Sequence, residues 1–182
     1  MTKIKGGQVR VRSCEYGAVA LGGNAAVLAD TALHATNPTE VTVFAGQPDV
    51  PRNLTVKGND ANVTGNVTIE GRNADGVAIT ETIALAGVAT VAGNKAFEEV
   101  TKITLPDYAV ANTERVRVGL GVKLGLPVRL SRNTIVAAFL GNAREVTPPT
   151  VTTSAAALEA NTITLNSALN GTAVTVDLYE TN

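Results

Sequence analysis

Few residues in this chain have side chains that catalyse reactions. His34 is the only histidine and Cys14 the only cysteine. A nucleophilic triad would have to use His34, and no nucleophile motif lies near it. Zinc needs several His or Cys ligands, and the chain has two such residues. We therefore expect no enzyme, no bound metal and no cofactor.

Three other patterns look like chemical sites but have simpler explanations. Gly119 and Gly121 lie in an alternating strand pattern with no helix start after it, so they do not form a phosphate loop. They predict instead that a neighbouring strand or subunit approaches closely. Glu98 and Glu99 are adjacent, so on a strand they point to opposite faces and cannot flank one substrate bond. The Asn and Asp residues at 59–62 fit turns better than a calcium loop.

Basic side chains form the one pattern that indicates binding. Arg10 and Arg12 alternate along one candidate strand, and Arg115, Arg117 and Lys123 along another. Either group could meet carboxylates on a partner protein. The alternative is a solvated strand face, where exposed charges contribute little energy.

The composition excludes several classes of partner. The formal net charge is -1 and aromatic residues make up 3%, so we expect neither nucleic-acid nor membrane binding. Charged residues are sparse at 17%, against about 25% in a typical globular protein. The resulting surface of Thr, Asn, Ala and Gly suits contacts between subunits. The alternative is that it is simply the surface of a neutral β-protein. No signal peptide is visible at the N-terminus, which predicts a soluble protein made in a reducing cytoplasm.

Hydrophobic residues recur with a period of two, which indicates strands. The clearest segment is 115–126, where Val and Leu at even positions predict one apolar face. Further strands are predicted at 41–44, 53–56, 66–70, 77–85, 95–105, 134–140, 161–165 and 172–179.

Three of these segments carry specific expectations. Asp75-Gly76 predicts a tight hairpin turn, because both residues accept its backbone angles. Glu81 falls on the apolar face of the segment after this turn, so either a bulge shifts the register or Glu81 lies at an open edge. The run 134–140 fits a strand buried on both faces or a short buried helix, and its flanks favour the strand.

Short strands at intervals of about 8–12 residues predict an all-β fold, a β-sandwich or barrel-like domain. Residues 1–37 differ in character, being rich in small residues and ending at the turn Asn37-Pro38. We interpret 1–37 as an N-terminal arm and 38–182 as the β-rich domain. An ordinary first strand and loop of one domain is the alternative.

Four stretches of the central chain resemble small structural proteins of tailed-bacteriophage virions, and most of all capsid decoration (cement) proteins. These stretches are Pro51–Val56, Gly65–Gly71, Asp75–Ile83 and Lys95–Pro106. The resemblance lies in strands and turns, without a catalytic signature. It implies a β-rich homo-oligomer, often a trimer, that binds the major capsid protein on the outside of an icosahedral head and stabilises the shell.

Other functions remain open from the residues. A β-sandwich adhesion or carbohydrate-binding module of a tail fibre is one, although scarce aromatic residues disfavour sugar binding. A tail-tube or head–tail joining protein is another. All of these functions need surfaces that bind neighbours and none needs an active site.

Overall fold

The computed structural model describes residues 10–35, 38–110 and 112–180, and in these ranges the chain is all-β, as predicted. The strands are β1 (Arg10–Ala18), β2 (Leu28–Ala32), β3 (Thr39–Val41), β4 (Arg52–Gly58), β5 (Asn66–Arg72), β6 (Ala78–Ala84), β7 (Val91–Ala92), β8 (Glu99–Leu105), β9 (Arg115–Gly125), β10 (Ile135–Leu140), β11 (Ala143–Arg144), β12 (Thr150–Thr152), β13 (Thr162–Thr164) and β14 (Ala173–Glu180). A single 3₁₀ turn, η1, covers Leu158–Ala160. The described part of the chain contains no helix with the length and apolar character that a membrane crossing needs.

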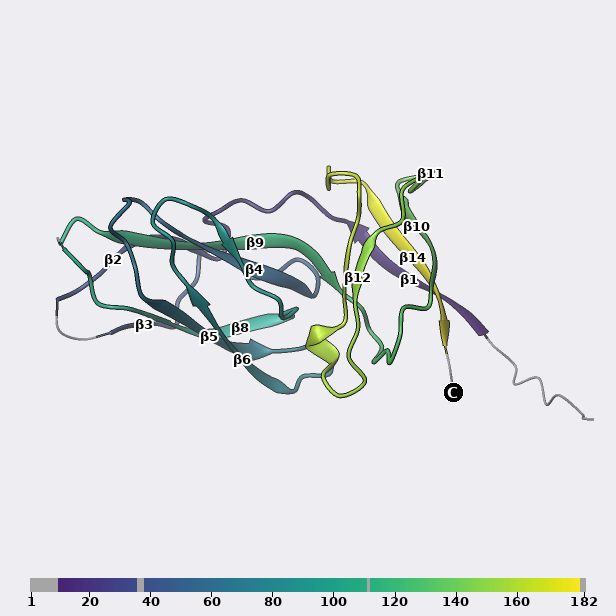
Figure 1. The fold of residues 1–182 in the computed structure, drawn as a ribbon, viewed down its shortest axis with the longest axis horizontal. Coiled ribbons are helices and arrows are strands. Elements are labelled where there is room, and N and C mark those ends of the chain that lie inside the picture. The colour runs from purple at the N-terminus through teal and green to yellow at the C-terminus, as the bar shows by residue number, and fades with distance from the viewer. Residues whose placement is uncertain (1–9, 36–37, 111, 181–182) are drawn as a thin grey trace, which may run out of the picture.

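Two of the three sheets form a sandwich. One has the order β12-β13-β9-β4-β7 with β2 also paired to β9, and the other has the order β3-β8-β5-β6. Figure 1 shows β9 and β4 lying over β5, β6 and β8. Between them lies a core of Val, Leu and Ile side chains around Phe97, which is fully buried. Alternation along each strand directs these side chains inward, so the predicted sandwich follows from the period of two.

The third sheet, which we call the terminal sheet, contains both the first and the last strand. Its order is β1-β14-β10-β11, and it lies at one end of the molecule (Figure 1). Its inner face carries Val174, Val176 and Leu178, which belong to a second hydrophobic cluster. Leu124 at the end of β9 joins the same cluster. The long strand β9 therefore connects the two cores, because Val116 and Val118 near its start lie in the first.

The segment predicted as an arm lies along this body wherever the structure describes it. β1 pairs with β14 over its whole length, and β2 pairs with β9. Leu33 belongs to the first core, while Cys14 and Val19 belong to the second. Within the described residues, 10–35 therefore pack against the rest of the chain. Residues 1–9, 36 and 37 lie outside the described residues.

A hairpin turn lies at Asp75-Gly76, as predicted, but of these two residues only Gly76 has a positive φ. The pairing around it also settles the place of Glu81. β5 and β6 pair without a register shift, and Gly76 has φ of +75°. β6 is the last strand of its sheet, so the edge alternative is correct and the bulge alternative is wrong. The Glu81 carboxylate accepts the backbone N–H of Asn94 at 2.6 Å and of Lys95 at 3.3 Å. This side chain therefore joins β6 to the segment after β7.

The predicted apolar face of β9 is interrupted. Val116, Val118 and Leu124 are fully buried, but Val122 is 41% exposed, which corrects the expectation of one continuous apolar face. The cause is a register shift, because Arg52 pairs with Leu124 while Leu54 pairs with Leu120. Extra residues on β9 bulge out between these pairs.

The glycines of β9 confirm the predicted close approach, and the approaching groups belong to this chain. A Cβ at Gly119 would overlap the backbone of Gly23 and Asn24, and one at Gly121 would overlap the side chain of Asn53. The segment between β1 and β2 therefore lies directly on β9 at this point.

The run 134–140 forms strand β10, as favoured, but it is not buried on both faces. Only Ala138 within β10 is fully buried, and Val136 is 39% exposed. The reason is that β10 is followed in its sheet only by the two-residue strand β11. Most of the outer edge of β10 therefore faces a hollow.

Candidate functional site

The five basic residues predicted to bind a partner do not form one patch. Arg10 and Arg12 are exposed on β1 of the terminal sheet. Arg115 and Arg117 lie at the start of β9. Lys123 lies eight residues after Arg115, which is about 26 Å on an extended strand. The two strands belong to different sheets.

Arg117 and Lys123 make side-chain contacts within the chain. Arg117 Nε lies 2.8 Å from Asp30 Oδ1, an ion-pair distance at which the angle is not that of a hydrogen bond. Lys123 Nζ donates to the Asn94 side chain at 2.6 Å and to the carbonyl of Gly93 at 3.1 Å. The first contact joins β9 to β2, and the second joins the bulge of β9 to the turn after β7, so both residues have a structural role.

His34 and Cys14 are held in different surroundings. His34 is exposed after β2, and its carbonyl accepts the backbone N–H of Tyr108. Cys14 is 6% exposed on the inner face of the terminal sheet. Across the described ranges, no three His, Cys, Asp or Glu side chains come together as metal ligands.

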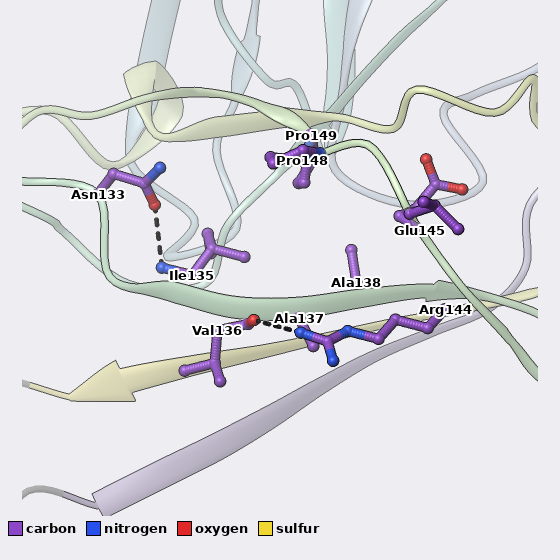
Figure 2. A pocket seen from close by; sticks show the side chains of 10 residues that line it. Asn133, Ile135, Val136, Ala137, Ala138, Arg144, Glu145, Pro148 and Pro149 are labelled. Carbon is purple, nitrogen blue, oxygen red and sulfur yellow. Dashed lines mark hydrogen bonds between the residues drawn. The ribbon is translucent and has the colours of Figure 1, made fainter.

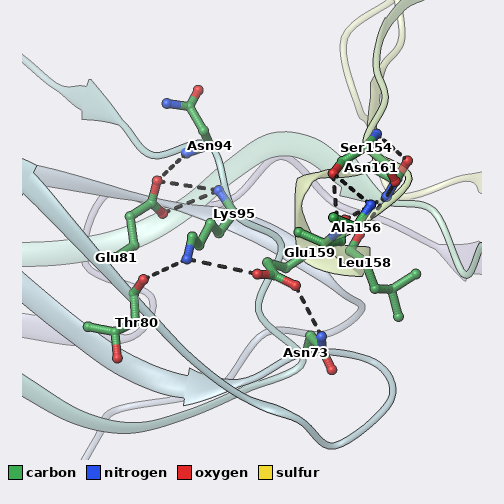
Figure 3. A network of polar contacts seen from close by, with 11 residues as sticks. Asn73, Thr80, Glu81, Asn94, Lys95, Ser154, Ala156, Leu158, Glu159 and Asn161 are labelled. Atoms are coloured by element: carbon green, nitrogen blue, oxygen red, sulfur yellow. Dashed lines mark hydrogen bonds and ion pairs between the residues drawn. The ribbon is translucent and has the colours of Figure 1, made fainter. Parts of the chain in front are cut away.

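A polar network joins the C-terminal part of the chain to the sandwich (Figure 3). Lys95 Nζ donates to the carbonyl of Thr80 at 2.9 Å and lies 3.8 Å from a carboxylate oxygen of Glu159. The other oxygen of Glu159 accepts from the Asn73 side chain at 3.2 Å. Beside it, the fully buried Asn161 accepts from Leu130 and Ser154. These contacts hold the turn η1 in place. They also give the charged groups of Lys95 and Glu159 partners within the chain.

A groove of about 570 Å³ lies along the outer edge of β10 (Figure 2). We call it the β10 groove. It is lined by Asn133, Ile135, Val136, Ala137, Ala138, Arg144, Glu145, Val146, Pro148 and Pro149. Its wall opposite β10 is the segment 145–149, which runs from β11 to β12.

The groove exists because pairing of β10 stops early on this side. β11 pairs only with Phe139 and Leu140, and the N–H of Glu145 then donates to the carbonyl of Ala138 at 2.8 Å. The next outward carbonyl, that of Val136, accepts from the Arg144 side chain at 3.4 Å, as Figure 2 shows. This distance is longer than the usual 2.7–3.2 Å. The Val136 carbonyl, at the edge of β10 beside the groove, therefore has only a weak hydrogen bond from Arg144.

Glu145 anchors the wall of the groove. Its carboxylate accepts the backbone N–H groups of Asn166 at 2.7 Å and Ser167 at 2.9 Å. Partial desolvation would raise the pKa of Glu145, but the hydrogen bonds from Ser167 and Asn166 outweigh it, so the pKa lies below its usual value. The next side chain, Val146, is 99% exposed. An ionised anchor thus holds an apolar side chain out in solvent.

The outer face of the terminal sheet continues this surface. Val11 and Tyr179 are opposite each other on β1 and β14 and are 56% and 42% exposed. Asp177, two pairs further along, accepts a hydrogen bond from Ser13 at 2.5 Å and is opposite Ala137 of β10. One end of the molecule therefore presents apolar side chains beside a partly open strand edge. Such a combination is typical of protein interaction sites.

A smaller hollow of about 350 Å³ lies between β1 and the segments around Pro51 and Pro127. Tyr16 donates from its hydroxyl to the carbonyl of Gly125 at 2.8 Å. Burial raises the pKa of Tyr16 well above its usual value, with a further rise from Cys14. The phenol is therefore a neutral packing group that joins β1 to the end of β9.

The β10 groove was not predicted from the sequence. The run Thr147-Pro148-Pro149-Thr150 is a stiff extended stretch beside an apolar strand, and this is the signal that could have indicated the groove.

No protein-family model matches the sequence, and neither a curated protein nor a solved structure matches it significantly.

Proposed function

We propose that this chain is a virion structural protein of a tailed bacteriophage, a capsid decoration protein that binds the major capsid protein on the outer surface of the icosahedral head. It acts as a homo-oligomer, with the trimer as the expected form. The proposal joins the resemblance of the central strands to a surface suited to assembly.

The observation that carries the proposal is the character of the terminal sheet. Val11, Tyr179 and Val146 are exposed at this end of the molecule, beside the β10 groove. Elsewhere, charged side chains such as Arg52, Lys95 and Lys123 are engaged within the chain. Exposed valines occur in the sandwich as well, Val43 at 83% among them, so the feature that marks the terminal sheet is that its exposed apolar side chains lie beside the groove.

A protein of this kind works by mass action. It stabilises whichever state of the shell it binds better, and the effect grows with its concentration relative to Kd. Many copies on a repeating lattice add modest contacts together. Burying one exposed valine contributes about 1.5–3 kcal/mol, so a small apolar surface suffices when it is repeated.

The test is co-sedimentation of the purified chain with purified expanded empty heads. We expect binding by the unmodified chain and loss of binding by Val11→Asp, because Val11 is 56% exposed on the terminal sheet and does not line the β10 groove. Val43→Asp is the matched control, because Val43 is 83% exposed but follows β3 in the sandwich. If the unmodified chain failed to bind heads and bound members of a glycan array, the adhesion module would replace this proposal.

A further inference from the structure

We infer that the β10 groove binds the N-terminal residues 1–5 of a second copy of this chain, which add a short antiparallel strand to the terminal sheet. The inference rests on the proposed function, because it names the contact through which copies associate. It concerns a different contact from the one with the shell.

The edge of β10 has room for one more strand. β11 covers Phe139 and Leu140, while Ile135–Ala138 border the groove. An incoming backbone N–H can replace the long contact of 3.4 Å between Arg144 and the carbonyl of Val136. Addition of an extended segment to an open sheet edge is a common mode of peptide recognition, in which backbone hydrogen bonds give affinity and alternate side chains give specificity.

The chemistry of residues 1–5 matches this groove. The sequence is Met-Thr-Lys-Ile-Lys, so Ile4 lies on one side of an extended strand and Lys3 and Lys5 lie on the other. Ile4 suits the apolar side of the groove, where Figure 2 shows Ile135 and Ala138 pointing toward Pro148 and Pro149. The two lysines, with no acidic residue among the first nine, bring positive charge to a surface that carries carboxylates.

Two carboxylates lie at suitable places. Asp177 is opposite Ala137, one strand further into the sheet, which puts it about 10 Å from an added strand and within reach of a long lysine side chain. Glu145 lines the groove itself. Arg144 also lines it, and we expect its guanidinium to move from the Val136 carbonyl when the strand binds.

The length of the N-terminal segment favours a second copy over the same chain. Arg10 and Ile135 lie at the same end of the terminal sheet, because they pair with Glu180 and Leu178 of β14. From β1 to the position beyond β10 is three strand spacings, or about 14 Å. The five steps from Lys5 to Arg10 span at most about 17 Å. Little length remains for the two reversals of direction that the same chain would need.

Disulfide trapping between two singly substituted chains tests the inference. Both chains carry Cys14→Ser, one also carries Ile4→Cys and the other Val146→Cys. Val146 is 99% exposed, so the change leaves folding intact. We expect a cross-linked dimer after mild oxidation of the mixture. The matched control replaces Val146→Cys by Val43→Cys, and it should give no dimer above background.

Two results would overturn the inference. One is a mixture that forms no more dimer than the Val43 control. The other is a chain carrying both Ile4→Cys and Val146→Cys that closes an intramolecular disulfide at high dilution, since residues 1–5 would then bind their own groove.

The native mass of the chain separates this inference from the proposed function. We expect loss of residues 1–5 to convert the oligomer to monomer. A full-length chain that binds heads yet stays monomeric at every concentration would refute the inference alone. Copies that cross-link through the groove but never bind heads would refute the proposed function alone.

Discussion

The Arg52 side chain donates a hydrogen bond of 2.8 Å from Nε to the carbonyl oxygen of Gly121, and Arg52 is fully buried. Its Nη1 donates to the carbonyl of Ala20 at 3.2 Å and to Asp49 at 2.9 Å. One guanidinium thus joins the bulge of β9, the segment after β1 and the loop before β4. A planar group with five donors suits this role better than an ammonium.

Replacing Arg52 should therefore destabilise the whole chain. Arg52→Met leaves the carbonyls of Gly121 and Ala20 without these donors, and each buried group that loses its partner costs about 1–3 kcal/mol. We expect a total loss of roughly 2–5 kcal/mol, comparable to a broken buried ion pair. Urea unfolding measures it. Arg129→Met, which removes an exposed pair with Asp75, should cost less than about 1 kcal/mol; equal effects would contradict the assigned role.

A methyl group at Gly119 should disturb the contact between β9 and the segment after β1. The added Cβ would overlap the backbone of Gly23 and Asn24, and backbone yields less readily than a flexible side chain. Overpacking of this kind typically costs about 1–3 kcal/mol. Gly23→Ala is the matched control, because a Cβ there has open space. Thermal unfolding of both variants should show a lower Tm for Gly119→Ala alone.

Truncation of Asn161 should loosen the turn η1. Asn161 is fully buried and its amide nitrogen donates to the carbonyls of Ser154 at 2.8 Å and Ala157 at 2.7 Å. Asn161→Ala leaves several buried groups unpaired, which should lower the free energy of unfolding by roughly 2–4 kcal/mol. Hydrogen exchange should accelerate at Leu130 and Ser154, whose N–H groups bond to Asn161. Unchanged exchange at both amides would count against this account.

The anchor at Glu145 should make stability depend on pH in the acid range. Its pKa in the folded chain lies below the usual value, so its contribution is fully present above the unfolded pKa of about 4.3. That contribution is lost as the pH falls through the folded pKa. Glu145→Gln should therefore be less stable than the unmodified chain at neutral pH and equal to it in strong acid. The carboxylate is partly exposed, so the difference should not exceed about 1 kcal/mol.

Much of the strand content could be predicted, because alternation is a local property. The hairpin at Asp75-Gly76 and the strands around Ile69 and Ile103 required only neighbouring residues. The edge position of Glu81 was one of two alternatives, since its partners Asn94 and Lys95 come from the turn after β7. The β10 groove was not predicted. That Arg117 and Lys123 bind a partner stays a prediction, and in the folded chain both also make internal contacts.

Local pattern was enough to establish an all-β chain poor in catalytic side chains, since residue types and their period of two are read directly along the sequence. Long-range pairing decided the rest. Only folding places the first strand beside the last, leaves Ile135–Ala138 next to a hollow and exposes Val146 beside it. The physical reason is that an open strand edge results from which distant strands fail to cover it, and no window of neighbouring residues contains that information.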